Sequence, residues 1–131
     1  MGLSRRGGNN DKGQLGNGTT TSSTTPVQVL GLSRATDIVA GRNHALALKQ
    51  DGTVWTWGDN FEGQLGNGTT TGRNTPGQVP GFSSASAVRS GSAHSLALKQ
   101  DGSLWAWGDN SSGQLGDGTL TDRSSPVSVL P

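Results

Sequence analysis

The chain has 131 residues, of which 29% are hydrophobic, 22 are glycine and none is cysteine, and its formal net charge is +1. This length suits one domain of ordinary size, but so few large apolar side chains predict a thin and dispersed core. The lack of cysteine excludes disulfides, cysteine-ligated zinc and thiol catalysis. The balanced charge argues against binding of nucleic acid, which usually requires a clustered basic excess.

No membrane attachment is expected either. No apolar run approaches the roughly 18 residues that a membrane span requires. The charged start of the chain, MGLSRRGG, lacks the apolar segment of a signal peptide. We interpret the small basic cluster of Arg5, Arg6 and Lys12 as a solvated end, and the compartment stays open.

A constant period of 50 residues runs through the chain. The motif Gly-Gln-Leu-Gly starts at positions 13, 63 and 113, and 30 of 50 aligned positions are identical between the two full copies. This self-similarity indicates internal duplication. The period divides the chain into a non-repeat end (1–7), a partial repeat (8–12), two full repeats (13–62 and 63–112) and a partial third repeat (113–131).

Each period contains four short segments that predict β-strands. In the first copy they are PVQVL (26–30), ATDIVAG (35–41), HALALK (44–49) and TVWTWG (53–58), and each recurs 50 residues later. The proline that opens the first segment suits either the first residue of a strand or an edge strand. Gly77 and Pro80 weaken the second copy of this segment. The last two segments alternate in character, as strands with two different faces do.

Asp-Gly lies between the last two segments of each copy, at Asp51-Gly52 and Asp101-Gly102. This dipeptide between alternating strands is a strong hairpin signal, and we predict type I′ turns, which need positive φ at both central residues. Helical periodicity is absent. Four short strands per 50 residues, joined by glycine-rich turns, are typical of a β-propeller blade. The predicted fold class is therefore all-β, an incomplete propeller with about two full blades of four antiparallel strands plus partial repeats.

The glycine-rich loop GDNFEGQLGNGT (58–69) raises the possibility of a ligand site. A phosphate loop would need a lysine and a following helix, and neither is present. Calcium would find oxygen ligands, but not the EF-hand spacing or its bidentate glutamate. We interpret the loop as a strand connector in which glycine reaches positive φ and Leu15, Leu65 and Leu115 plug the core beneath each copy. No cofactor or metal is expected.

These motifs resemble the regulator of chromosome condensation repeat family. The resemblance extends from Gly8 to Pro131 and implies a blade of four antiparallel strands, usually seven to a closed ring. The positions that carry it are implied to be framework residues. In the first copy they are Gly41, His44, Asp51, Gly52, Trp57, Gly58, Gly63, Leu65 and Gly66. In the second copy they are Gly91, His94, Asp101, Gly102, Trp107, Gly108, Gly113, Leu115 and Gly116.

The two histidines and four tryptophans are candidates for chemistry. Catalysis by a histidine would need a nucleophile or acid partner within reach. The two histidines, His44 and His94, occupy equivalent positions of successive repeats, so we do not expect them to share a site. Tryptophans could stack on sugars or bases. We expect Trp57 and Trp107 in the core and leave Trp55 and Trp105 open. No acid–base pair or metal cluster points to an enzyme.

Residues that differ between otherwise matching copies are the candidates for binding a partner, because function in propellers usually lies on loops carried by a shared scaffold. Exposed phenylalanine and arginine are favoured interface anchors. Our candidate partner contacts are Arg42, Phe61, Arg73 and Arg123, with plain surface variation as the alternative. Sequons at positions 17, 67 and 110 would matter only in a glycosylating pathway.

The favoured function is a non-enzymatic protein-interaction module made of propeller repeats. The resemblance also suggests guanine-nucleotide exchange on a small GTPase, through the family's namesake, and similarity to β-lactamase inhibitor proteins suggests inhibition of a secreted enzyme. Repeat arrays generally need about three units for stability. We therefore expect the chain to be a fragment of a longer propeller or to self-associate.

Overall fold

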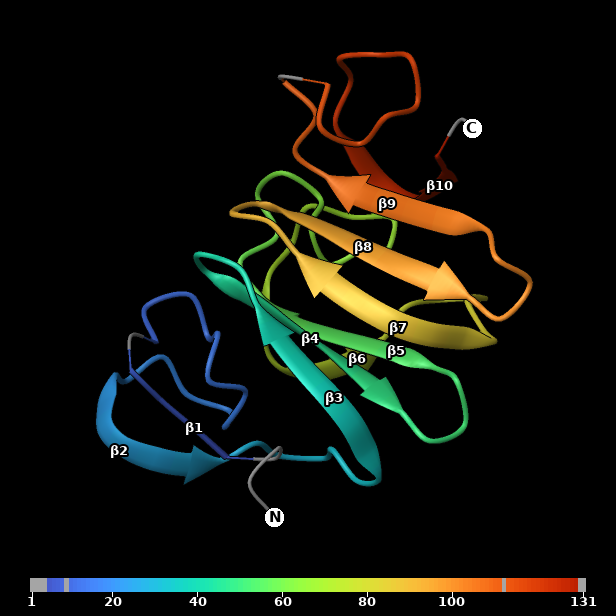
Figure 1. The fold of residues 1–131 in the computed structure, drawn as a ribbon. Helices are drawn as coiled ribbons and strands as arrows, with labels where there is room; N and C mark the ends of the chain where they lie inside the picture. The colour runs from blue at the N-terminus through green and yellow to red at the C-terminus, as the bar shows by residue number, and fades with distance from the viewer. Residues whose placement is uncertain (1–4, 9, 112, 130–131) are drawn as a thin grey trace.

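The computed structural model describes residues 5–8, 10–111 and 113–129 of the chain. All regular structure in this described part is β, which confirms the all-β fold class (Figure 1). Three antiparallel sheets follow one another along the chain, the first with two strands and the others with four. The described segments include no helix that could reach across a lipid bilayer.

We name the sheets by their order in the chain. Half-blade A consists of β1 (Arg5–Gly8) and β2 (Ser23–Gln28). Blade B consists of β3 (Ala35–Ala40), β4 (His44–Lys49), β5 (Val54–Gly58) and β6 (Arg73–Gln78). Blade C consists of β7 (Ala85–Ser90), β8 (His94–Lys99), β9 (Leu104–Gly108) and β10 (Arg123–Ser128). Each strand of blades B and C pairs with its neighbour in sequence, and β1 and β2 match β5 and β6 in the repeat.

The large apolar side chains lie between the sheets. The cluster between blades B and C includes Leu46, Leu48, Val54, Val79, Phe82, Ala85, Val88, Ala97 and Trp107. The cluster between half-blade A and blade B includes Val29, Leu32, Ala45, Ala47 and Trp57. Trp57 and Trp107 are fully buried, which confirms their place in the core, and Trp55 and Trp105 are half-buried. The core is therefore dispersed, as the composition predicts.

The strand that carries the proline begins earlier than expected. Pro76 and Pro126 stand fourth in β6 and β10, so the interpretation of proline as the first strand residue was wrong. Both strands lie at the edge of their sheet, and the pairing register shifts across the segment that holds the proline. An edge strand with a bulge tolerates a residue without an N–H, so the edge alternative is confirmed.

Gly77 does not weaken β6, which is as long as β2 and β10. The guanidinium of Arg73, four residues earlier, packs into the space that a Cβ at Gly77 would fill. The glycine, which is specific to this copy, thus leaves room for the arginine; the first copy has Ser23 and Val27 at these positions and the third has Arg123 and Val127.

The two Asp-Gly hairpins form at the predicted places, but the turn type was wrong. Gly52 has a φ of 83°, whereas Asp51 does not have positive φ. The Lys49 carbonyl accepts the N–H of Gly52 (3.0 Å), and the Thr53 carbonyl accepts that of Lys49 (3.0 Å). This is a three-residue loop, a type I turn followed by a left-handed glycine. Asp51 favours it because its Oδ1 accepts the N–H (3.0 Å) and the hydroxyl (2.6 Å) of Thr53.

Candidate interaction surface

The loop between β5 and β6 is folded around the buried amide of Asn60. Its Oδ1 accepts the N–H of Leu65 (2.9 Å), and its Nδ2 donates to the carbonyls of Thr69 (2.9 Å) and Thr71 (3.0 Å). The asparagines 50 residues earlier and later make the same three contacts in their own loops. One side chain thereby satisfies the buried N–H of Leu65 and two partly buried carbonyls of the loop.

The same network fixes which side chains of the loop are buried and which are exposed. Leu15, Leu65 and Leu115 lie buried beneath their loops, which confirms them as plugs. Phe61, the residue after the buried asparagine, is 78% exposed. A rigid loop thus presents a large aromatic side chain to solvent, where it is available as an interface anchor.

His44 is fully buried at the junction of blades B and C. Its Nε2 lies 3.0 Å from the Ser95 hydroxyl and 3.3 Å from that of Ser90. Because the Ser95 hydroxyl donates to the Gln64 carbonyl (2.8 Å), its oxygen is left to accept from the imidazole. The ring also fills the space that a Cβ at Gly41 would need. This arrangement suits a framework histidine that ties two blades together.

His94, in the equivalent slot of blade C, is only half-buried. Burial lowers the pKa of His94, and the carboxylate of Asp109 opposes that shift. The two histidines therefore have different surroundings. Among the described residues, no group of three or more histidine or acidic side chains is placed to hold a metal ion.

A cavity of about 310 Å³ lies where the loops of blades B and C meet, and we call it the junction cavity. It is lined by Arg42, Asn43, Asp59, Glu62, Gln64, Ser92, Ala93 and Asp109. The backbone N–H of Arg42 donates to the Ser92 carbonyl (2.9 Å), so the two repeats are joined at its rim. The cavity brings the predicted contact Arg42 together with Glu62, the neighbour of Phe61.

Three carboxylates and one guanidinium face the junction cavity, which makes it polar and mostly acidic. The buried Gln64 holds two of the carboxylates in place, since its Nε2 lies 3.4 Å from Asp59 Oδ2 and 3.3 Å from Glu62 Oε1. The N–H of Ser111 holds the pKa of Asp109 below its ordinary value. The site can therefore take a cationic or hydrogen-bond-donating group from a partner.

Arg73 and Arg123 lie away from the junction cavity, on the outer strands β6 and β10. Arg73 packs over Gly77 and lines a separate cavity of about 290 Å³ with Asp11, Lys12, Thr20, Gly72 and Asn74. The structure thus separates the four predicted contacts into a junction pair, Arg42 and Phe61, and two outer-strand arginines.

Arg123 forms an ion pair within its own blade. Its Nε donates to Asp117 Oδ2 at 2.9 Å. The Asp117 Oδ1 accepts the hydroxyl of Thr119 (2.7 Å) and its N–H (2.9 Å). Asn67 and Asn17 stand at this position in the earlier copies, so the carboxylate is specific to the third loop.

Acid is expected to remove the contribution of Asp117. The Thr119 hydroxyl, with help from its N–H and from Arg123, holds the pKa of Asp117 far below its ordinary value of 3.8. A carboxyl whose pKa falls on folding stabilises the native state above its unfolded pKa and loses that contribution as pH falls further. We expect Asp117→Asn to be less stable than the wild type at pH 7 and to lose less stability between pH 4 and pH 2. Urea denaturation at a series of pH values measures this, and parallel curves for both proteins would contradict it.

Several junction residues were not predicted as contacts. Asp59, Gln64 and Asp109 lie in the repeated glycine-rich loops, which we interpret from the sequence as strand connectors. Ser92 and Ser95 differ from their counterparts Arg42 and Ala45, and this difference is the signal that could have marked them. Sequence alone does not show that residues about 50 positions apart meet at one cavity.

Comparison with known proteins agrees with the repeat and the fold. A family model described as the regulator of chromosome condensation (RCC1) repeat matches residues 7–48, 51–98 and 101–131. A second model with the same description matches residues 35–64 and 85–114. The RCC2 homolog of Danio rerio is 49% identical over 53 residues, which are 39% of this chain and 11% of that protein.

Solved structures show the same arrangement of sheets. Human WBSCR16 superposes with a TM-score of 0.83 at 28% identity, covering 95% of this chain and 34% of that one. Prp20p of Saccharomyces cerevisiae, described with its binding properties to Gsp1p and histones, superposes with a TM-score of 0.83 at 23% identity, covering 93% and 33%. The chain therefore spans about a third of the length of these structures and a ninth of the RCC2 homolog.

Proposed function

Because this chain belongs to the regulator of chromosome condensation (RCC1) repeat family, we propose that its segment of propeller works as a non-enzymatic protein-interaction module. The surface that binds the partner is the loop end of blades B and C, with Phe61 as the apolar anchor and the junction cavity as the polar socket beside it. The partner presents an apolar patch next to a basic or hydrogen-bond-donating side chain.

One observation carries this proposal: Phe61 is 78% exposed on a loop that its buried asparagine holds rigid. An exposed aromatic side chain on a fixed backbone loses little entropy on binding. The next residue, Glu62, lines the junction cavity, so an apolar and an acidic contact lie side by side. In interfaces such central anchors contribute most of the affinity, while surrounding polar groups select the partner.

The test is a photocrosslinking amino acid at position 61, with the same substitution at Leu120 as a matched control. Leu120 is also exposed, at 69%, but lies on the loop of the third copy. We expect position 61 to crosslink a defined partner that position 120 does not. Phe61→Ala should then weaken binding of that partner by about 10-fold or more, the range of an interface anchor. Equal crosslinking at both positions would contradict the proposal.

Guanine-nucleotide exchange on a small GTPase is the second candidate function. It is favoured by the likeness of fold to Prp20p, which is described as binding Gsp1p. A nucleotide-release assay with the GTPase that this chain captures separates the two functions. Accelerated release would favour exchange activity, and capture without acceleration would favour the interaction module.

A further inference from the structure

Blades B and C pack against each other face to face. We call the face of blade B that carries Leu46 and Leu48, and the equivalent face of blade C, the front of each blade, and the opposite face its back. Leu46, Leu48 and Val54 on the front of blade B are buried against blade C. The hairpin tip of blade B also touches blade C, because the N–H of Ala85 donates to the Gly52 carbonyl (2.9 Å). Gly52 is buried there, and a Cβ on it would lie 3.2 Å from the N atom of Ser84.

The matching front face of blade C is open. Leu98 and Leu104 are each 39% exposed, whereas their counterparts Leu48 and Val54 are 7% and 0% exposed. Together with Leu96 they line a hollow of about 230 Å³ on β7, β8 and β9. The hairpin tip is open as well, since a Cβ at Gly102 would meet no atom within 4 Å. The front of blade C therefore resembles the front of blade B without a sheet packed on it.

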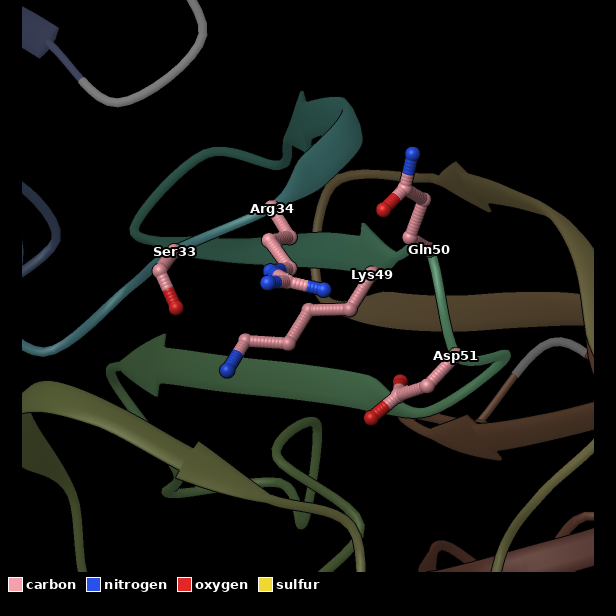
Figure 2. A pocket seen from close by; sticks show the side chains of 5 residues that line it. All are labelled: Ser33, Arg34, Lys49, Gln50 and Asp51. Atoms are coloured by element: carbon pink, nitrogen blue, oxygen red, sulfur yellow. The ribbon is translucent and has the colours of Figure 1, made fainter.

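The back of blade B, in turn, resembles the back of blade C. A cavity of about 390 Å³, lined by Ser33, Arg34, Lys49, Gln50 and Asp51, opens there (Figure 2), and we call it the tip socket. Ser33 and Arg34 match Ser83 and Ser84, where the hairpin tip of blade B packs against blade C. Arg34 and Ser84 even share the uncommon positive φ, 57° and 62°. The counterparts of the hairpin tip in half-blade A, residues 1 and 2, lie outside the described residues.

Half-blade A covers this back only in part. Its strands match β5 and β6, and the described residues supply no counterpart of β3 and β4 on that side. As a result Ile38 is half-buried, while its counterpart Val88 is fully buried. The exposed front of blade C therefore resembles the front of blade B, and the partly covered back of blade B resembles the back of blade C. The chain thus carries a second version of each of the two surfaces that form the B–C contact.

We propose that copies of this chain associate head to tail. The front of blade C and the hairpin tip at Asp101-Gly102 of one copy occupy the back of blade B and the tip socket of the next. The occupant is a second copy because each copy carries both halves of a contact that it already makes once internally. The arriving β9 and β10 take the places of β1 and β2, so the receiving half-blade A moves aside. This inference concerns other surfaces than the loop end that binds the partner, and it is tested independently.

Light scattering on size-exclusion fractions over a concentration series tests this proposal. The wild type should exceed the monomer mass of 13.4 kDa increasingly with concentration. Leu98→Glu places a charge on the apolar front of blade C, and Ser33→Trp fills the tip socket. Each variant alone should therefore stay monomeric. An equimolar mixture should form a dimer, because each variant keeps one intact surface and a head-to-tail contact needs one of each. Leu120→Glu, an exposed control, should behave as the wild type does.

A second measurement follows the displacement of half-blade A. Tryptic cleavage after Arg5 and Arg6 should become faster as the wild type associates and should not depend on concentration in either variant. A wild type that stays monomeric throughout would overturn the proposal. So would a mixture that fails to form a dimer while both variants keep the circular dichroism of the wild type. A Ser33→Trp variant that dimerises on its own would overturn it as well, because that result would indicate a front-to-front contact.

Discussion

Replacing Asn60 by alanine is expected to lower the free energy of unfolding by about 3 kcal/mol. The amide of Asn60 serves three backbone groups, those of Leu65, Thr69 and Thr71, and the side chain is buried. The Leu65 N–H is buried and the two threonine carbonyls are partly buried, and each group left without its partner costs about 1 kcal/mol. Urea denaturation followed by tryptophan fluorescence measures the change.

Asn74→Ala is the matched control for this variant. The amide of Asn74 donates one exposed hydrogen bond, to the Gly18 carbonyl (3.1 Å). Such a bond contributes about 1 kcal/mol at most. Equal losses in the two variants would show that Asn60 does not organise its loop. A loop that melts in Asn60→Ala should also lose crosslinking from position 61, because the anchor would no longer be fixed.

The local structure of each repeat follows from its sequence because the deciding interactions are short in range. Alternation places Leu46 and Leu48 on one face of β4 and Ala45 and Ala47 on the other, and the structure buries them in two different clusters. The turn type was missed because the side chain of Asp51 binds Thr53 and favours the looser three-residue loop. The Asp-Gly dipeptide alone does not distinguish these two turns.

The surroundings of a residue, in contrast, depend on which sheet lies next to it. Leu48 and Leu98 share the local sequence LALKQDG, yet one is 7% and the other 39% exposed. His44 and His94 differ in the same way, fully buried against half-buried. No local pattern predicts such a difference, because the residues that cover the first member of each pair come from about 50 positions further along the chain.

The candidate site, too, is predicted in part from the sequence and in part only from the structure. The rule that differing positions between copies carry recognition selects Arg42 and Phe61, which the structure places at the loop end of blades B and C. It also selects Arg73 and Arg123, whose side chains instead pack over Gly77 and pair with Asp117. Differences between copies therefore mark exposed candidate contacts and internal compensations alike. Only the contact geometry separates the two, and whether Arg42 and Phe61 bind a partner remains the prediction to be tested.

Gly58→Ala is expected to be strongly destabilising, with a loss of about 4 kcal/mol or more. Gly58 has a φ of 105°, and a Cβ there would lie 2.5 Å from the carbonyl oxygen of Asn43 and 2.8 Å from the Cα of His44. Both atoms belong to the backbone, so no side-chain rotation relieves the overlap, and β4 would have to separate from β5. Against a typical total stability of about 5–15 kcal/mol, such a loss removes a large share of the stability of the protein.

Gly102→Ala is the control that separates the cost of atomic overlap from the cost of a positive φ in a residue other than glycine. Gly102 has a φ of 87°, but a Cβ there would meet no atom within 4 Å. Only the cost of a left-handed non-glycine residue remains, about 1–2 kcal/mol. Urea denaturation of the two variants should therefore give losses that differ at least twofold. Similar losses would mean that the backbone contact at Gly58 relaxes without cost and that the pairing of β4 with β5 is not what requires glycine there.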